Sequence, residues 1–334
     1  MQPKLIWLRT RFFRALPLCI RKPTTVKLEP SMQKDKDARK ASPIGKVAVI
    51  GVGHMGRPMA RRIHDEGFHL TVCDTTQANL VDFSALGVRT TIKPRDCAEC
   101  DVVIVLVATP DQLRTVTMGT EGLRVGMGGG KPRYLVVMST VSPTDMTELE
   151  SSFSDMPVHI VDAPISGGVV GAEQGTLTVL VGGAQTHITA LQPLFDAVGK
   201  KVFHYGPLGA GQTTKIVNNI LAISNLMISA EAYRIALSNG LNWEQLMPAL
   251  EAGSGRNFMS KCPGDAREVY AAWTRSEEAY HAVQTINRKD IELALSIAPP
   301  GLSLPALESL RKLLDQTDDE TLANWRMLGG AAQA

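Results

Sequence analysis

The residues best suited to chemistry are a lysine and an asparagine at the start of a long apolar segment. Lys215 and Asn219 lie in the run GAGQTTKIVNN, residues 209–219, and a mostly apolar stretch follows as far as Leu237. In a helix, side chains four residues apart lie on the same face. Because burial disfavours the charged form of a lysine, its pKa falls toward neutrality, where an amine exchanges protons most effectively. The pair therefore predicts an acid–base site, although a lysine near a helix start can also extend its amine to water.

A glycine-rich turn upstream predicts a dinucleotide site. The sequence GVGHMG, residues 51–56, follows the apolar run 47–50 and precedes a segment with helical spacing. The glycines allow a tight turn and a close approach to a pyrophosphate, and the helix N-terminus supplies amide donors. Asp74, at the end of the next predicted strand, would accept hydrogen bonds from an adenosine ribose and repel a 2′-phosphate. The context favours NAD over NADP, with a purely structural turn as the alternative.

A third segment, DAPISGGVVGA at residues 162–172, follows another predicted strand. Ser166 offers a hydroxyl, and Gly167 and Gly168 offer unhindered backbone amides, so the three can hold a carboxylate. An ordinary glycine-rich turn is the other interpretation of this segment alone.

The elements that must position these residues alternate along the first half of the chain. Short apolar runs predict strands at residues 47–50, 70–74, 102–107, 134–138 and 158–162. Gaps of helix length separate them, which is typical of a doubly wound parallel sheet. Ligands bind such sheets at the carboxyl ends of the strands, where the segments 51–56 and 162–172 begin.

The second half is mostly helical. An apolar helix is predicted over residues 212–237, hydrophobic on nearly every face and therefore buried in the protein or in an assembly. Asn242 can cap the next helix, and further helices are predicted within 265–296 and 303–316. The predicted fold class is α/β, a Rossmann-type doubly wound sheet followed by an all-α domain built on one long central helix. The expected divisions are a leader or disordered extension (1–45), a dinucleotide-binding domain (46–207), an all-α substrate and oligomerisation domain (208–320) and a tail (321–334).

Composition narrows the functional classes. The chain has 334 residues, 44% of them hydrophobic, and a net charge of +2, which argues against a nucleic-acid surface. No continuous apolar run predicts a membrane span, so no membrane partner is expected. The five cysteines fit a reducing compartment, and Cys97 and Cys100 are expected to be buried thiols. The sequence offers no ligand set for a metal.

The first residues resemble a weak organelle transit peptide. Seven lysines and arginines precede the first acid, Glu29, with large apolar residues between them. The protein is therefore expected in the mitochondrial matrix if this leader is real, and in the cytoplasm otherwise. An over-extended start, with Met32 as the first true residue, is the alternative.

Four separated motifs resemble the β-hydroxyacid dehydrogenase family. They are GVGHMGRPMA (51–60), the segment 162–172, the segment 209–219, and Lys289-Asp290 with Leu293-Ala294. The resemblance extends over residues 46 to about 316 and implies a dehydrogenase that binds a nicotinamide dinucleotide.

The resemblance also implies residue roles. Lys215 would be the general acid–base group, and Asn219 would hold the substrate. Ser166, Gly167 and Gly168 would bind its carboxylate. The implied cofactor-binding residues are Gly51, Gly53, His54, Met55, Gly56, Asp74, Val107, Ala108, Thr140 and Lys289.

Two departures from the family pattern bear on these roles. Val107 and Ala108 stand where many relatives have Leu-Pro, which bears on the adenine and ribose contacts near this loop. Lys289 and Asp290 follow the family pattern, and Asp290 is expected to orient Lys289. The segment 273–284 lacks the usual glycine and phenylalanine, which leaves the substrate less well defined. His281 within it is expected to be a surface residue.

The resulting functional hypothesis is hydride transfer between NAD and a small 3-hydroxy acid, with 3-hydroxyisobutyrate first. Tartronate semialdehyde or threonate-type substrates are alternatives on the same scaffold. A non-catalytic dinucleotide-binding module is the alternative of another class. Relatives form dimers or tetramers, so a homodimer or homotetramer is expected.

Overall fold

The computed structural model describes residues 44–127, 133–261, 263–316 and 319–330, apart from the side chains of 263–265. The expected leader therefore lies almost wholly outside the described residues.

A six-stranded parallel sheet has the order β3-β2-β1-β4-β5-β6. Its strands are β1 (Lys46–Ile50), β2 (His69–Cys73), β3 (Arg89–Thr91), β4 (Val102–Val105), β5 (Arg133–Val137) and β6 (Val158–Asp162). The five predicted strands are confirmed within a few residues. The order reverses between β1 and β4, so the carboxyl ends of these two strands flank the expected ligand crevice. Of these six strands, β3 alone was not predicted, because its sequence RTT has no apolar run and none of its residues is buried.

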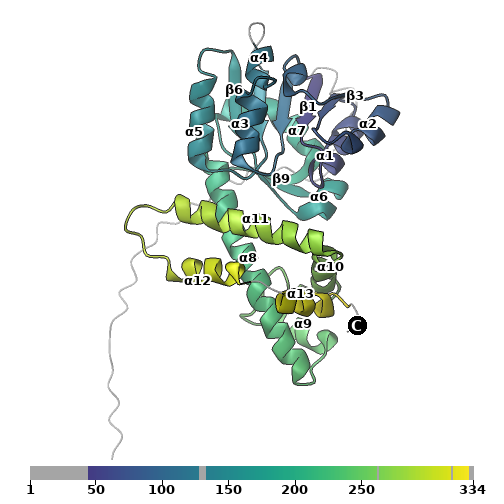
Figure 1. Cartoon of the computed structure of the whole chain (residues 1–334), viewed down its shortest axis with the longest axis vertical. Coiled ribbons are helices and arrows are strands. Elements are labelled where there is room, and N and C mark those ends of the chain that lie inside the picture. The colour runs from purple at the N-terminus through teal and green to yellow at the C-terminus, as the bar shows by residue number, and fades with distance from the viewer. Residues whose placement is uncertain (1–43, 128–132, 262, 317–318, 331–334) are drawn as a thin grey trace, which may run out of the picture. The chain divides into compact units, whose positions relative to one another are not determined.

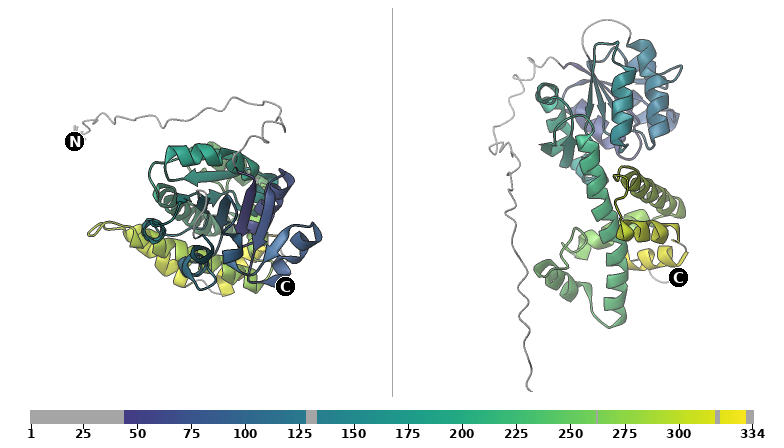
Figure 2. Two further views of the ribbon diagram at one scale, coloured as in Figure 1. Left: turned by 90° about the horizontal axis from the view of Figure 1, so that it is seen from above. Right: turned by 90° about the vertical axis from the view of Figure 1, so that its left-hand side faces the viewer.

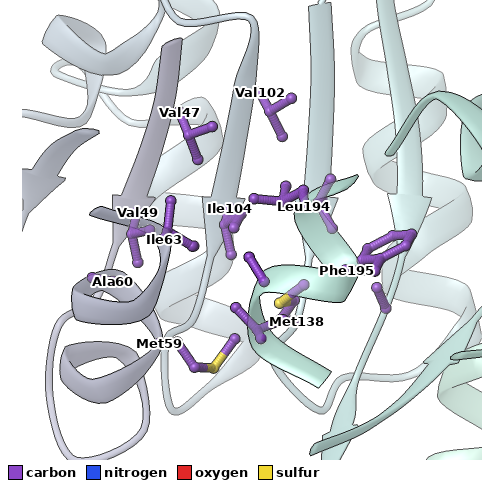
Figure 3. Packing of buried hydrophobic residues seen from close by; sticks show 14 of the residues in the cluster. Val47, Val49, Met59, Ala60, Ile63, Val102, Ile104, Met138, Leu194 and Phe195 are labelled. Carbon is purple, nitrogen blue, oxygen red and sulfur yellow. The ribbon is translucent and has the colours of Figure 1, made fainter. Parts of the chain in front are cut away.

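Helices cover both faces of this sheet (Figure 1). On one face, α1 (Gly56–Asp65) and α7 (Gln185–Val198) contribute Met59, Ile63, Leu194 and Phe195 to a core shared with Val49 (Figure 3). Alternate strand residues point to the other face, where they pack with α3, α4 and α5. On the first face, α2 (Val81–Ala85), which follows the short η2 (Gln77–Asn79), adds Phe83 to the core. The elements on the other face are η3 (Pro94–Cys97), α3 (Pro110–Met118), α4 (Leu123–Gly126) and α5 (Pro143–Ser152).

A second, three-stranded sheet follows β6 and was not predicted. It has the order β7-β8-β9, from β7 (Ile165–Ser166), β8 (Leu177–Val181) and β9 (Gly199–His204), with α6 (Gly168–Gln174) between β7 and β8. The segment expected to bind a carboxylate thus forms β7 and the beginning of α6.

The helical half is organised along α8 (Ala210–Ser238), visible as the long helix in Figures 1 and 2. Around it lie α9 (Trp243–Ala252), α10 (Pro263–Trp273), α11 (Glu277–Ser296), α12 (Pro305–Asp315) and α13 (Asp319–Leu328). As predicted, Asn242 caps α9 by accepting the backbone N–H of Gln245 at 2.9 Å. The expected tail from residue 321 is wrong in part, because Leu322, Trp325 and Leu328 are buried in the helical core.

Within the single chain, burial of α8 is one-sided, so the chain alone does not bury every apolar face of this helix. Ile216, Ile223 and Leu226 are buried, whereas Leu221 and Ile228 are 61% and 60% exposed. By length and composition alone α8 could cross a membrane, so the expectation that no segment qualifies was too strict. The buried face of α8 packs into the hydrophobic core that α9 to α13 share. This packing is typical of the central helix of a globular domain.

Candidate active site

The glycine turn after β1 has a shape that a pyrophosphate can approach. A Cβ atom on Gly51 would lie 2.2 Å from the Leu106 carbonyl oxygen, and one on Gly56 would lie 1.9 Å from the Gly51 carbonyl oxygen. These two glycines keep the turn tight. A Cβ on Gly53 would meet nothing within 4 Å, so this side of the turn faces open space. The turn therefore fits the phosphates of a dinucleotide at the N-terminus of α1.

Asp74 lies at the carboxyl end of β2, next to that turn. Its Oδ2 accepts the backbone N–H of Val52 at 2.9 Å, and its Oδ1 accepts that of Thr76 at 2.8 Å. Because each carboxylate oxygen can accept more than one hydrogen bond, both can still receive ribose hydroxyls. The position and the fixed geometry of Asp74 fit the predicted ribose contact.

The other predicted cofactor residues near the turn differ in their exposure and in their hydrogen bonds. His54 is exposed, and Met55 is half-buried against the core of the sheet. The backbone N–H of Val107 donates to Ser139 Oγ at 2.8 Å, and that of Ala108 donates to Gln112 Oε1 at 2.8 Å. Both loop amides are thus engaged within the protein, and they fix the loop that follows β4.

A buried carboxylate fastens the start of α8 to the sheet. Asp162, at the end of β6, is fully buried and accepts the backbone N–H groups of Gly209 at 2.8 Å and Gln212 at 2.7 Å. Burial raises the pKa of Asp162, and these hydrogen bonds oppose that shift. The Gln212 side chain in turn donates to the Ser139 carbonyl at 2.9 Å and accepts the Val141 N–H at 3.1 Å.

Lys215 follows Gln212 by about one turn of α8 and is half-buried. Burial is the main cause that lowers the pKa of Lys215 from 10.5 to about 8, while Asp290 opposes the shift and Lys289 adds to it. In the described part of the chain, its amine has no direct hydrogen bond or ion pair. An unpaired amine that titrates near neutral pH can take or give a proton.

Asp290 connects the helices around this amine. Asn219 on α8 donates to Asp290 Oδ2 at 2.6 Å, and Lys289 Nζ lies 3.1 Å from Asp290 Oδ1. Lys289 Nζ also donates to the Thr140 carbonyl at 3.0 Å. Asp290 thus contacts both Asn219 and Lys289, and Lys289 extends the chain of contacts to Thr140. The charge of Asp290 also favours the protonated form of Lys215. The ion pair agrees with the expected orienting role of Asp290.

Two family models together match almost the whole described chain. The NAD binding domain of 6-phosphogluconate dehydrogenase matches residues 46–206. The model described as NAD-binding of NADP-dependent 3-hydroxyisobutyrate dehydrogenase matches residues 209–327. An NAD-dependent L-serine dehydrogenase of Pseudomonas aeruginosa is 34% identical over 273 residues, which cover 79% of this chain and 89% of the relative. The chain belongs to the β-hydroxyacid dehydrogenase family.

Further relatives agree with this membership. A mitochondrial 3-hydroxyisobutyrate dehydrogenase of Rattus norvegicus is 33% identical over 64% of each chain. A solved 3-hydroxyisobutyrate dehydrogenase of Mycobacterium tuberculosis, whose title includes L-serine, has a TM-score of 0.67 at 26% identity and covers 81% of this chain and 93% of its own. This β-hydroxyacid dehydrogenase is therefore an oxidoreductase, and its NAD-binding domains support NAD as the cofactor.

The segment expected to bind the substrate carboxylate lies beside the anchor of α8. Ser166 is half-buried in β7, and Gly167 and Gly168 have φ angles of 132° and 64°. These angles favour glycine, so the segment exposes backbone amides without side chains. Only three residues separate Ser166 from Asp162, which places this loop next to the β6 end that holds α8.

Sequence reasoning did not assign Asp162, Gln212 or Ser139 to the site. Both Asp162 and Gln212 lie within the motifs described above. The signal of Asp162 is an acid at the end of a predicted apolar strand, and that of Gln212 is a polar residue directly after a glycine. Ser139 carried no such signal, because its role depends on contacts with residues distant in the sequence, among them Val107 and Gln212.

Proposed function

We propose that this protein transfers a hydride between NAD and a small 3-hydroxy acid, most directly 3-hydroxyisobutyrate. The observation that carries the proposal is the amine of Lys215, unpaired within the described residues and with its pKa lowered to about 8. Such a group changes protonation state near the working pH of an enzyme.

When bound, the dinucleotide supplies the hydride acceptor or donor of the reaction. In oxidation, the neutral amine of Lys215 takes the proton of the substrate hydroxyl. In reduction, the ammonium form of Lys215 gives a proton to the carbonyl oxygen. Lys289 favours the neutral amine and Asp290 favours the ammonium form, so the two neighbours keep both forms accessible.

Substrate binding requires a carboxylate receptor, and the Ser166 loop offers one. The Ser166 hydroxyl and the amides of Gly167 and Gly168 can donate to the carboxylate oxygens. Asn219 is engaged by Asp290 and also accepts a hydrogen bond from Asn218 at 3.2 Å. Its contribution to substrate binding would use the remaining donor and acceptor capacity of its amide.

The names of the relatives suggest the chemical class of the substrate. L-serine, 2-(hydroxymethyl)glutarate and 3-hydroxyisobutyrate appear in the names of similar enzymes. All three are 3-hydroxypropanoates that differ in the group on carbon 2, and glycerate, the reduced form of tartronate semialdehyde, is another. We infer that the 3-hydroxypropanoate part is common to the substrate of this protein.

The test is a substrate panel with NAD, followed by the absorbance of NADH, with each compound at equal concentration. Turnover of 3-hydroxyisobutyrate above L-serine, glycerate and a 2-hydroxy acid would support the proposal. Turnover of L-serine alone would move the assignment to that amino acid. No turnover with any compound, together with measured NAD binding, would favour the non-catalytic module.

The compartment is a separate proposal. We infer a mitochondrial matrix location if the basic leader is a cleaved targeting segment, and a cytoplasmic location if it is not. The mass of the mature N-terminus distinguishes the two.

A further inference from the structure

An arginine of the helical half contacts the glycine turn of the dinucleotide-binding half. Arg275 lies between α10 and α11, and its NH2 is 3.3 Å from Nε2 of His54. His54 lies between Gly53 and Met55, beside the side of the turn that faces open space. A guanidinium is thus held where the phosphates of a dinucleotide would approach.

The residues on both sides of Arg275 hold it in place. Thr274 is buried and its hydroxyl donates to the Tyr270 carbonyl at 2.8 Å, which ends α10. The Ser276 hydroxyl accepts the backbone N–H of Ala279 at 3.2 Å, which caps α11. With both neighbours fixed, the exposed side chain of Arg275 extends from a short, well-defined connection.

The charge of Arg275 has no acidic partner in the part of the chain that the structure describes. Among the residues that the structure describes, no carboxylate lies within ion-pair distance of its guanidinium. Arg57, the other arginine near the turn, is paired with Asp82 at 2.8 Å and bonds Asn79 at 3.1 Å. The first turn of α1 contains no acidic residue, so no carboxylate of this helix turn opposes an anion.

We propose that Arg275 binds the pyrophosphate of the dinucleotide, so that the helical half contributes directly to cofactor affinity. This assignment rests on the proposed function, in which a dinucleotide occupies the turn. A guanidinium can bond two phosphate oxygens at once, which a histidine nitrogen cannot match. The phosphates would replace the contact with His54. Since α11 begins directly after Ser276 and carries Lys289 and Asp290, cofactor binding would also fix the helix that lines the proton-transfer site.

Ligand fragments test the assignment without any need for catalysis. ADP-ribose contains the pyrophosphate, whereas adenosine lacks phosphate. Calorimetric titration of the full chain is expected to show that Arg275→Ala weakens ADP-ribose binding about ten-fold or more. Adenosine binding should be unchanged, and Arg275→Lys should fall in between. The control is Arg256→Ala, since Arg256 is exposed and its carboxylate neighbour, Glu251, is 3.8 Å away.

Other outcomes would overturn the proposal in distinguishable ways. Equal ADP-ribose affinity in Arg275→Ala and the unmodified protein would remove Arg275 from the cofactor site. An equal loss of adenosine binding would indicate a structural role. If titration with the two full cofactors showed that Arg275→Ala loses affinity for NADP but not for NAD, the guanidinium would lie at the 2′-phosphate instead. If the unmodified protein bound neither ADP-ribose nor NADH, the proposed function itself would fail.

Discussion

Asp162 Oδ2 accepts the backbone N–H of Gln212 at 2.7 Å, and this contact joins the end of β6 to the first turn of α8. The other carboxylate oxygen accepts the N–H of Gly209 at 2.8 Å. A carboxylate at a helix N-terminus satisfies amides that have no partner within the helix. Because Lys215 lies about one turn further on, Asp162 also fixes the position of the Lys215 amine relative to the sheet.

Asp162→Asn is expected to destabilise the fold. The new amide group would face one of the two backbone donors, so one charge-assisted hydrogen bond is lost in a fully buried place. The expected loss of unfolding free energy is about 2–3 kcal/mol, measured by urea denaturation. Asp111→Asn is the matched control, because the Asp111 side chain is 92% exposed and forms a surface ion pair with Arg114. Equal stability of the two variants would contradict the anchoring role.

Removal of the Lys215 amine should abolish proton transfer but not cofactor binding. Lys215→Ala is expected to reduce kcat by about 10²–10⁴-fold, the usual contribution of a general acid–base group, with NADH affinity retained. The measurement is NADH absorbance for turnover and calorimetry for binding. Lys312→Ala, on α12, serves as the control lysine variant. Near-normal kcat in Lys215→Ala would remove this residue from the mechanism.

The lowered pKa of Lys215 predicts opposite pH profiles for the two directions. The amine is protonated below about pH 8 and neutral above it. Oxidation needs the neutral form, so its kcat should rise with pH through about 8. Reduction needs the ammonium form, so its kcat should fall over the same range. A pair of profiles with the same slope near pH 8 would contradict the assignment.

The fold was more predictable from the sequence than the site. Apolar strand runs and the GVGHMG turn predict the parallel sheet directly, because each of these patterns is formed by residues that are neighbours in the sequence. Asp162, by contrast, gains its role only when α8 returns to the carboxyl end of β6. The contact of Arg275 with His54 joins residues from the two halves of the chain, so no local pattern could indicate it. The one-sided burial of α8 likewise depends on which helices pack against it.

Two glycines of the same turn should respond differently to alanine. Gly51 has a φ of +91°, and a Cβ there would meet the Leu106 carbonyl at 2.2 Å, so Gly51→Ala should lose about 2 kcal/mol or more of stability. Gly53→Ala meets no atom within 4 Å and should fold normally. Its methyl group would instead occupy the approach to the phosphates and weaken NADH binding. Urea denaturation and calorimetry separate the two effects, and equal effects on both quantities would contradict the assigned turn.

Asp74 should determine the preference for NAD. Its carboxylate would repel a 2′-phosphate, so Asp74→Asn is expected to raise the relative kcat/KM for NADP by about ten-fold, or roughly 1.4 kcal/mol. The amide can still accept one of the two backbone hydrogen bonds now made to Val52 and Thr76. The readout is the ratio of kcat/KM with NAD and NADP. An unchanged ratio would mean that Asp74 serves only to hold the turn.

The exposed face of α8 predicts self-association. Val217, Leu221, Ile228 and Ile235 are 50–66% exposed, and their spacing places them along one side of the helix. We propose that this face packs against the same face of a second copy, in a homodimer or within a homotetramer, since a two-fold axis can bury one apolar stripe against itself. Leu221→Asp combined with Ile228→Asp should therefore give a monomer in light scattering. Ile92→Asp, at a 54% exposed position of the other half, should leave the assembly unchanged. A monomeric unmodified protein at assay concentration would show that this stripe has another role.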